Sequence, residues 1–331
     1  MKSMTNSTFK PAWWLKNRHL QTLFPSLCRR VPSPELHRER IVTSDGDFLD
    51  IDWCGTNTDS PLVILLHGLS GSSNSGYIKG LQRALQKNNL RSVTLNFRGC
   101  SGEYNNTSRC YHSGETNDLD FLYRTLRERE PNTHFSIVGF SLGANVLLKW
   151  LGERGNSVSL SSAVAVSTPF VLGICATTLD KGFSRLYRAN LLRELKKYMN
   201  DKWLHLEIHR NSFEAEKIKQ CGDLSKIKSF WEYDNQVVAK LYGFKNAHDY
   251  YAQSSSRQFL KKITIPTLLI QAKDDPFMTT DVIPNTSELA SCVKLELTQN
   301  GGHVGFIAGK NPFRPVYWLE QRIAAFLTKT I

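Results

Sequence analysis

Three short apolar runs that alternate with helix-like segments constrain the fold of this chain more than any other feature. The runs are "PLVILLHG" (61–68), "RSVTLNFRG" (91–99) and "HFSIVGF" (134–140), and a glycine stands at or near the end of each. Brief runs of this kind are typical of strands buried on both faces of a sheet. Residues 115–130, between the second and third runs, have the apolar spacing of an amphipathic helix. Strand, helix and strand in succession predict a parallel sheet with right-handed crossovers.

The same pattern continues on both sides of this region. Residues 37–53 read as two strands joined at Asp45-Gly46, a favoured hairpin turn. Three further strand-like segments and a last helix follow downstream, at 161–170, 265–275, 292–302 and 315–327. We therefore expect one α/β domain that spans residues 1–331.

Residues 170–257 break the alternation, because they are helix-rich, charged and aromatic and contain no buried-strand run. We interpret them as an inserted helical cap over one end of the sheet. Residues 1–36 precede the first predicted strand, and we expect them to form an N-terminal extension packed on the core.

The formal net charge of +12 at pH 7 is the one unusual bulk property of this chain. A basic surface attracts phosphate groups on nucleic acid or on anionic lipid. The sequence contains no zinc-finger spacing, RNP motif, P-loop or GxGxxG. We therefore expect no nucleic-acid partner.

The cellular location is inferred from segments that the sequence lacks. The N-terminus has no continuous apolar segment of the kind a secretory signal requires, and no stretch approaches about 18 uninterrupted apolar residues. The seven cysteines are scattered without a CxxC pair, which indicates neither a zinc cluster nor a disulfide framework. We expect a cytoplasmic protein with reduced thiols.

A serine stands between two glycines at the end of the third apolar run. Gly139-Phe140-Ser141-Leu142-Gly143 has the form GxSxG and lies between a predicted strand (135–138) and a predicted helix (144–151). A sharp strand-to-helix turn of this kind exposes the central serine above the sheet, and only small neighbours avoid collision there. The motif predicts a nucleophilic serine at position 141; the alternative is a chance glycine pair in a tight turn.

A serine nucleophile needs a base and an orienting carboxylate, in the chain order Ser, Asp, His. Asp274 and Asp275 follow the predicted strand "IPTLLI", and His303 follows "CVKLEL" in a glycine-rich loop. Of the two aspartates we favour Asp275, because a residue before proline is held extended and its carboxylate can project toward the histidine. A structural role for His303 is the alternative.

The developing oxyanion needs two backbone donors. One is the N–H after the nucleophile, at Leu142, and the other comes from the loop after the third strand. "LLHGLSGSS" ends such a strand, so we assign the second N–H to Leu69. His67 in that loop is expected to be structural, and His112 is expected to cap or pack rather than to react.

Eight motifs carry a resemblance to a known family: "HLQT", "HGLSGSSNSGY", "NFRGCSGE", "YHSGET", "GFSLGAN", "KGFSR", "KDDPFM" and "NGGHVGFI". In this order, and over nearly the whole chain, they resemble the YheT-type esterases of the α/β-hydrolase superfamily. The resemblance implies a mostly parallel eight-stranded sheet flanked by helices, an inserted helical cap, no metal or organic cofactor, and hydrolysis of carboxylic esters. It also places the nucleophile, acid and base on Ser141, Asp275 and His303.

Two functions from different classes follow. The first is a serine esterase that acts through an acyl-enzyme on a small-molecule ester, either a short acyl ester or a lipid ester. The alternative is a non-catalytic protein that kept the fold and binds a lipid or a partner. The basic amphipathic segment at 181–200 and the pair Trp13-Trp14 add a further hypothesis, peripheral contact with an anionic membrane, although such a helix more often packs on its own domain.

Overall fold

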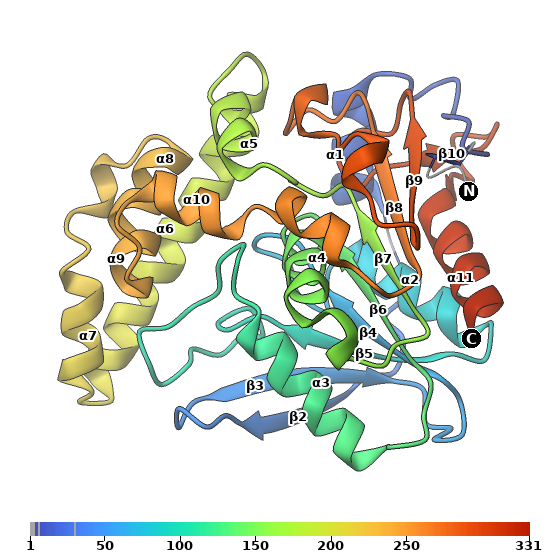
Figure 1. Ribbon diagram of the computed structural model, residues 1–331. Coiled ribbons are helices and arrows are strands. Elements are labelled where there is room, and N and C mark those ends of the chain that lie inside the picture. Colours follow the sequence, from blue (N-terminus) through green and yellow to red (C-terminus); the bar gives the residue numbers. More distant parts are fainter. Residues whose placement is uncertain (1–3, 6, 30) are drawn as a thin grey trace.

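A mostly parallel sheet forms the centre of the molecule (Figure 1). The computed structural model describes residues 4–5, 7–29 and 31–331. Across the sheet the strands follow the order β1-β9-β8-β7-β6-β4-β5-β3-β2. Their bounds are β1 (Met4–Thr5), β2 (His37–Val42), β3 (Phe48–Cys54), β4 (Leu62–Leu66), β5 (Arg91–Asn96), β6 (Phe135–Phe140), β7 (Ser162–Val166), β8 (Thr267–Ala272) and β9 (Val293–Thr298).

The eight strands β2 to β9 are the sheet that the sequence predicts. Every pair from β5 through β4, β6, β7 and β8 to β9 is parallel, whereas β3 runs antiparallel to both of its neighbours, β2 and β5. The predicted hairpin forms β2 and β3, and Gly46 in its turn has φ +77°. The two-residue strand β1 adds a parallel edge beside β9, and no apolar run marks so short a strand in the sequence.

Helices cover both faces of the sheet. Helices α3 (Asn117–Arg129) and α4 (Leu142–Arg154) lie on one face, and α2 (Gly76–Gln86) and α11 (Trp318–Thr330) lie on the other. Successive side chains of a strand point to opposite faces. In β4, Ile64 and Leu66 pack into the core beneath α3 and α4, while Val63 and Leu65 pack beneath α2 and α11. Burial on both faces explains why the run is apolar at every position.

The chain between β7 and β8 is helical and contains no strand. We call its helices the cap helices: α5 (Leu172–Leu179), α6 (Ser184–Ile208), α7 (Ser212–Lys219), α8 (Phe230–Tyr233), a π-helical turn (Asp234–Val238), α9 (Ala239–Tyr242) and α10 (Ala247–Ser254). They pack around an apolar core of their own, and Figure 1 shows them gathered to the left of the sheet. They occupy the segment for which the sequence predicts an insertion.

The N-terminal segment lies against the end of the chain. Helix α1 spans Arg18–Cys28, and the Phe9 ring contacts the rings of Phe306 and Trp318. Residues 307 and 308 (β10, Ile307–Ala308) pair with β11 (Val316–Tyr317). The predicted extension, residues 1–36, includes positions 1–3, 6 and 30, which lie outside the described residues. None of the helices in the described part of the chain is long and apolar enough to cross a membrane.

Candidate active site

Ser141 lies in the sharp turn between β6 and α4. Its backbone has φ +50° and ψ −117°, a conformation that residues with a side chain rarely adopt. A Cβ atom on Gly139 would lie 2.5 Å from the carbonyl oxygen of Gly143, and one on Gly143 would lie 2.5 Å from that of His67. Gly139 is therefore required by the close approach of the first turn of α4, and Gly143 by the close approach of the end of β4.

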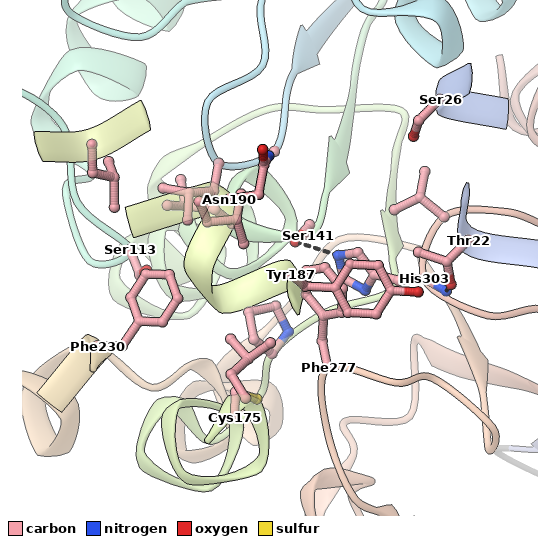
Figure 2. Close-up of a pocket in the computed structure, with 18 of the residues that line it drawn as sticks. Thr22, Ser26, Ser113, Ser141, Cys175, Tyr187, Asn190, Phe230, Phe277 and His303 are labelled. Carbon is pink, nitrogen blue, oxygen red and sulfur yellow. Dashed lines mark hydrogen bonds between the residues drawn. The ribbon is translucent and has the colours of Figure 1, made fainter. Parts of the chain in front are cut away.

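The structure brings Ser141, His303 and Asp275 together from three separate loops. The His303 Nε2 and Ser141 Oγ atoms are 2.8 Å apart, and Figure 2 marks this hydrogen bond. The His303 Nδ1 atom lies 2.8 Å from Asp275 Oδ2. The Asp275 carboxylate accepts only, so Nδ1–H donates to it and Nε2 accepts from the serine hydroxyl. Such an arrangement can remove the proton of Ser141 as its oxygen attacks an electrophilic carbon.

The two neighbouring aspartates have different partners. Asp275 is 1% exposed, and its second oxygen accepts a hydrogen bond from the Phe277 N–H at 2.8 Å. Asp274 instead accepts from the Gly302 N–H at 3.0 Å. Burial raises the pKa of the Asp274 carboxyl above its usual value. Asp274 thus holds the loop that carries the histidine, whereas Asp275 contacts the imidazole.

Further contacts fix the imidazole in place, and sequence reasoning missed them. The backbone N–H of His303 donates to Thr22 Oγ1 at 2.9 Å, and the Phe277 ring stacks on the imidazole with ring centroids 4.0 Å apart. Beside Thr22, the buried Gln21 amide donates to the Ile307 carbonyl and accepts from the Ile307 N–H. Both residues belong to the motif "HLQT", which is part of the family resemblance. The sequence does not show that this motif contacts the loop of His303.

The loop that holds Leu69 passes beside the serine. A Cβ atom on Gly68 would lie 3.2 Å from the Cβ of Ser141. Within the described residues, the Leu69 and Leu142 N–H groups donate to no acceptor. Both residues line the cavity that contains Ser141. The two N–H groups are thus free to receive a hydrogen-bond acceptor from a ligand.

His67 shapes this loop and is itself enclosed. Its Nδ1–H donates to the Gly68 carbonyl at 2.7 Å, and its Nε2 accepts from the Phe97 N–H at 3.1 Å. Burial lowers the pKa of His67 to about 4, so the ring is neutral at physiological pH. A neutral ring held at both nitrogens agrees with the structural role expected for it.

His112 has aromatic neighbours on several sides. Its ring contacts the rings of Tyr242, Phe244 and Tyr250, and its Nδ1 accepts from the Gly114 N–H at 3.1 Å. Burial, aided by the charges of Lys149 and Arg109, lowers the pKa of His112 to about 3. The contacts are those of a packing residue, although His112 is also among the residues that line the cavity.

A cavity of about 1110 Å³ opens around Ser141. Its walls come from the cap helices on one side and from α1 and the start of α2 on the other. The cap side is mainly apolar and aromatic, and its side chains include Leu172, Leu179, Tyr187, Leu191, Leu195, Phe230, Tyr233 and Tyr251. In the described residues no group of three or more His, Cys, Asp or Glu side chains is arranged to hold a metal ion.

Comparison with known proteins places this geometry in context. The alpha/beta hydrolase fold model matches residues 61–310. The chain is 39% identical to the candidate esterase YheT of Escherichia coli (strain K12), over 98% of this chain and 94% of that protein. It is 29% identical to phospholipase ABHD3 of Mus musculus, over 95% of this chain and 77% of that protein. Among solved structures, the esterase Pf2001 of Pyrococcus furiosus aligns with a TM-score of 0.57 and 18% identity over 98% of each chain, a likeness of fold.

Proposed function

The chain belongs to the alpha/beta hydrolase fold family and is a carboxylic ester hydrolase, and from this premise we propose that it cleaves its substrate through an acyl-enzyme formed on Ser141. His303 is the general base and acid, and Asp275 orients it. The observation that carries the proposal is the pair of 2.8 Å contacts that links the three side chains in series.

The proposed reaction has two halves. Ser141 Oγ attacks the ester carbonyl carbon while His303 Nε2 takes the hydroxyl proton, and Asp275 stabilises the imidazolium. The imidazolium then gives this proton to the departing alcohol as the C–O bond of the ester breaks. In the second half, water attacks the acyl-enzyme, its proton passes to Nε2, and the acid leaves as the proton returns to Ser141 Oγ.

The negative charge that develops on the carbonyl oxygen needs donors placed in advance. Among the described residues the Leu69 and Leu142 N–H groups meet no acceptor, and both residues border the same cavity, so we assign them as the oxyanion hole. Losing one such donor typically costs about 3 kcal/mol of transition-state stabilisation.

The substrate that fits this cavity is an ester with a sizeable acyl or alcohol part, and we place lipid esters and acyl esters in this class. A volume of about 1110 Å³ exceeds the usual size of a drug-sized ligand site. The apolar cap side favours hydrocarbon, because burial of apolar surface contributes about 25 cal/mol per Å². The relative named as a phospholipase supports the lipid-ester half of this range.

Labelling with a fluorophosphonate tests the nucleophile. The serine oxygen displaces fluoride, so wild-type protein should gain the mass of one probe less HF, and Ser141→Ala should gain none. Hydrolysis of p-nitrophenyl esters from acetate to dodecanoate then reports how much chain the cavity accepts. A Ser141→Ala variant that still carries the label, or that still turns over, would overturn the assignment.

Peripheral contact with an anionic membrane is a second part of the proposal. Leu27, Phe183 and Leu186 line the cavity and are also 77%, 47% and 60% exposed. The first lies on α1 and the other two lie at the start of α6, where Arg185 is exposed between them. The amphipathic pattern left open whether this segment packs on its own domain or meets a membrane; Phe183 and Leu186 lie exposed at the cavity edge. Apolar and basic side chains in one place suit an anionic lipid surface.

Vesicle sedimentation tests this contact. The protein should bind vesicles that contain phosphatidylglycerol, bind phosphatidylcholine vesicles weakly, and detach as salt is raised. Leu27→Asp with Leu186→Asp should reduce binding. Phe213→Asp, at a residue 71% exposed on α7, is the matched control and should leave binding unchanged. Equal binding by both variants, or none by wild type, would remove the membrane contact.

A further inference from the structure

One carboxyl group lines the cavity, and the proposed reaction does not use it. Asp234 is the single aspartate or glutamate among the described residues of the cavity wall. Its neighbours in that wall are apolar and aromatic, and they include Phe230 and Tyr233 on α8 and Tyr251 on α10. A wall built only to hold hydrocarbon has no need of an acid at this point.

The local backbone places Asp234 at a departure from regular helix. Helix α8 starts with a capping box between Ser229 and Glu232. It then runs into the π-helical turn, which begins at Asp234. Single π-helical turns inside helices occur frequently at functional sites. The turn sets Asp234 against α10, which supplies a hydrogen-bond donor to its side chain.

The two carboxyl oxygens of Asp234 differ in their contacts. The Tyr251 hydroxyl donates to Oδ2 at 2.6 Å. No donor in the described part of the chain reaches Oδ1, and this atom is not fully enclosed. Because the side chain borders the cavity and keeps some accessible surface, Oδ1 is open to a group that enters the cavity.

The surroundings determine which kind of group suits Oδ1. Burial raises the pKa of Asp234 to about 7, which means that this part of the cavity disfavours charge. The same desolvation would act against a buried ammonium group. A plain hydrocarbon chain would shield Oδ1 from water and give it no partner, which is also costly. A neutral hydroxyl donor satisfies Oδ1 without bringing a second charge into the site.

We infer that Asp234 is a specificity-determining residue that binds a hydroxyl group on the part of the ester that lies beneath the cap helices. The inference rests on the proposed function, since it concerns the same cavity and reaction. It narrows the substrate class from esters with a plain hydrocarbon part to esters whose buried part carries a hydroxyl.

Matched pairs of esters test this selectivity without assuming which side of the ester lies beneath the cap. One pair is p-nitrophenyl octanoate and its ω-hydroxy counterpart, and the other is octyl acetate and ω-hydroxyoctyl acetate. Both pairs are repeated with shorter and longer chains, because the chain length sets how far the hydroxyl lies from the ester group. For at least one pair, at one or more chain lengths, the kcat/KM of wild type should be about 10-fold or more higher for the hydroxylated ester than for the plain ester. A difference of this size is expected between a buried polar group that is hydrogen-bonded and one that is left unpaired.

Variants separate the role of Asp234 from a general effect on the cap. Asp234→Leu should abolish or reverse the preference, and Asp234→Asn should keep part of it because an acceptor oxygen is retained. Asp223→Leu, at an exposed aspartate that precedes the short 3₁₀ turn Leu224–Lys226 ahead of α8, is the control and should leave the preference at the wild-type value.

Two outcomes overturn the inference: wild type shows no preference at any length, or Asp234→Leu keeps the full preference. The first needs no variant, so a misfolded Asp234→Leu would not prevent the test. Failure of the proposed function looks different, because neither ester of any pair would then be cleaved and the fluorophosphonate would not label Ser141.

Discussion

The backbone N–H of His303 donates a hydrogen bond to Thr22 Oγ1 at 2.9 Å across a separation of 281 residues. The Thr22 hydroxyl in turn donates to the Arg18 carbonyl at 2.8 Å. Helix α1 therefore holds the loop of the proposed base from outside the sheet. A Cβ atom on Gly302 would lie 2.6 Å from Thr22 Oγ1, so helix and loop are in direct contact.

Thr22→Val should lower kcat, because it leaves the His303 N–H unsatisfied and loosens the imidazole. We expect a loss of about 10-fold, as for other buried hydrogen bonds broken on one side, with KM little changed. Thr22→Ser keeps the hydroxyl and should restore most of the rate. Steady-state kinetics across pH 5 to 9 measure both effects, and a positioning role predicts a shifted pH profile that a purely structural loss would not give.

Thr328→Val is the matched control for this comparison. The Thr328 hydroxyl in α11 donates to the Ala324 carbonyl, the same spacing as Thr22 and Arg18. This variant should match wild type in kcat and in pH profile. If Thr22→Val also matched wild type, α1 would have no part in positioning His303.

Asp275→Asn and Asp274→Asn should differ sharply in their effect. The first replaces the acceptor of His303 Nδ1–H and favours the wrong tautomer, which lowers kcat by about 10⁴-fold in enzymes with such a triad. The second weakens a contact to Gly302 and should cost about 10-fold or less. Single-turnover release of p-nitrophenol measures both variants. A larger loss for Asp274→Asn would transfer the role of acid to the neighbouring residue.

Ser141→Gly should inactivate the protein and also stabilise it. Glycine adopts φ +50° without strain, and an unfavourable backbone conformation costs about 1–3 kcal/mol. Ser141→Ala removes the same hydroxyl but keeps the Cβ atom, so it isolates the backbone contribution. Urea unfolding should give Ser141→Gly a free energy of unfolding about 1 kcal/mol above that of Ser141→Ala. Equal values would mean that the turn carries no strain at this residue.

Much of the fold could be predicted because its signals are local. The central strands are short segments rich in apolar and β-branched residues, and β4 to β9 were recognisable for that reason. Ser141, Asp275 and His303 each follow a predicted strand, and parallel strands carry their following loops to one edge of the sheet. The sequence therefore predicted that these three residues lie at the same edge. Those three positions needed no knowledge of the cap helices.

The contacts that the sequence did not reveal depend on distant segments. Thr22 meets His303 only because α1 docks beside the loop after β9, and no periodicity encodes docking. Whether Phe183 and Leu186 are exposed was left open by the sequence, because an amphipathic pattern shows an apolar face without showing whether protein or a cavity lies against it. Nothing in the sequence distinguishes Asp234 either, because a single aspartate in a charged segment is usually exposed to solvent.

The stability of the protein should fall as the pH falls from about 6.5 toward 4, and His112 should account for part of the slope. Its pKa is about 3 in the folded protein and 6.5 when exposed. Between these values the unfolded chain binds a proton that the folded chain does not, so the stabilisation is present above 6.5 and is lost as pH falls. One such proton corresponds to about 1.4 kcal/mol per pH unit.

Urea unfolding at pH 7, 6 and 5 gives the slope of unfolding free energy against pH for wild type and variants. His112→Asn keeps an acceptor for the Gly114 N–H and should flatten the slope by about that amount, even where packing loss lowers stability at every pH. An unchanged slope in His112→Asn would mean that the buried ring is not the group that takes up the proton.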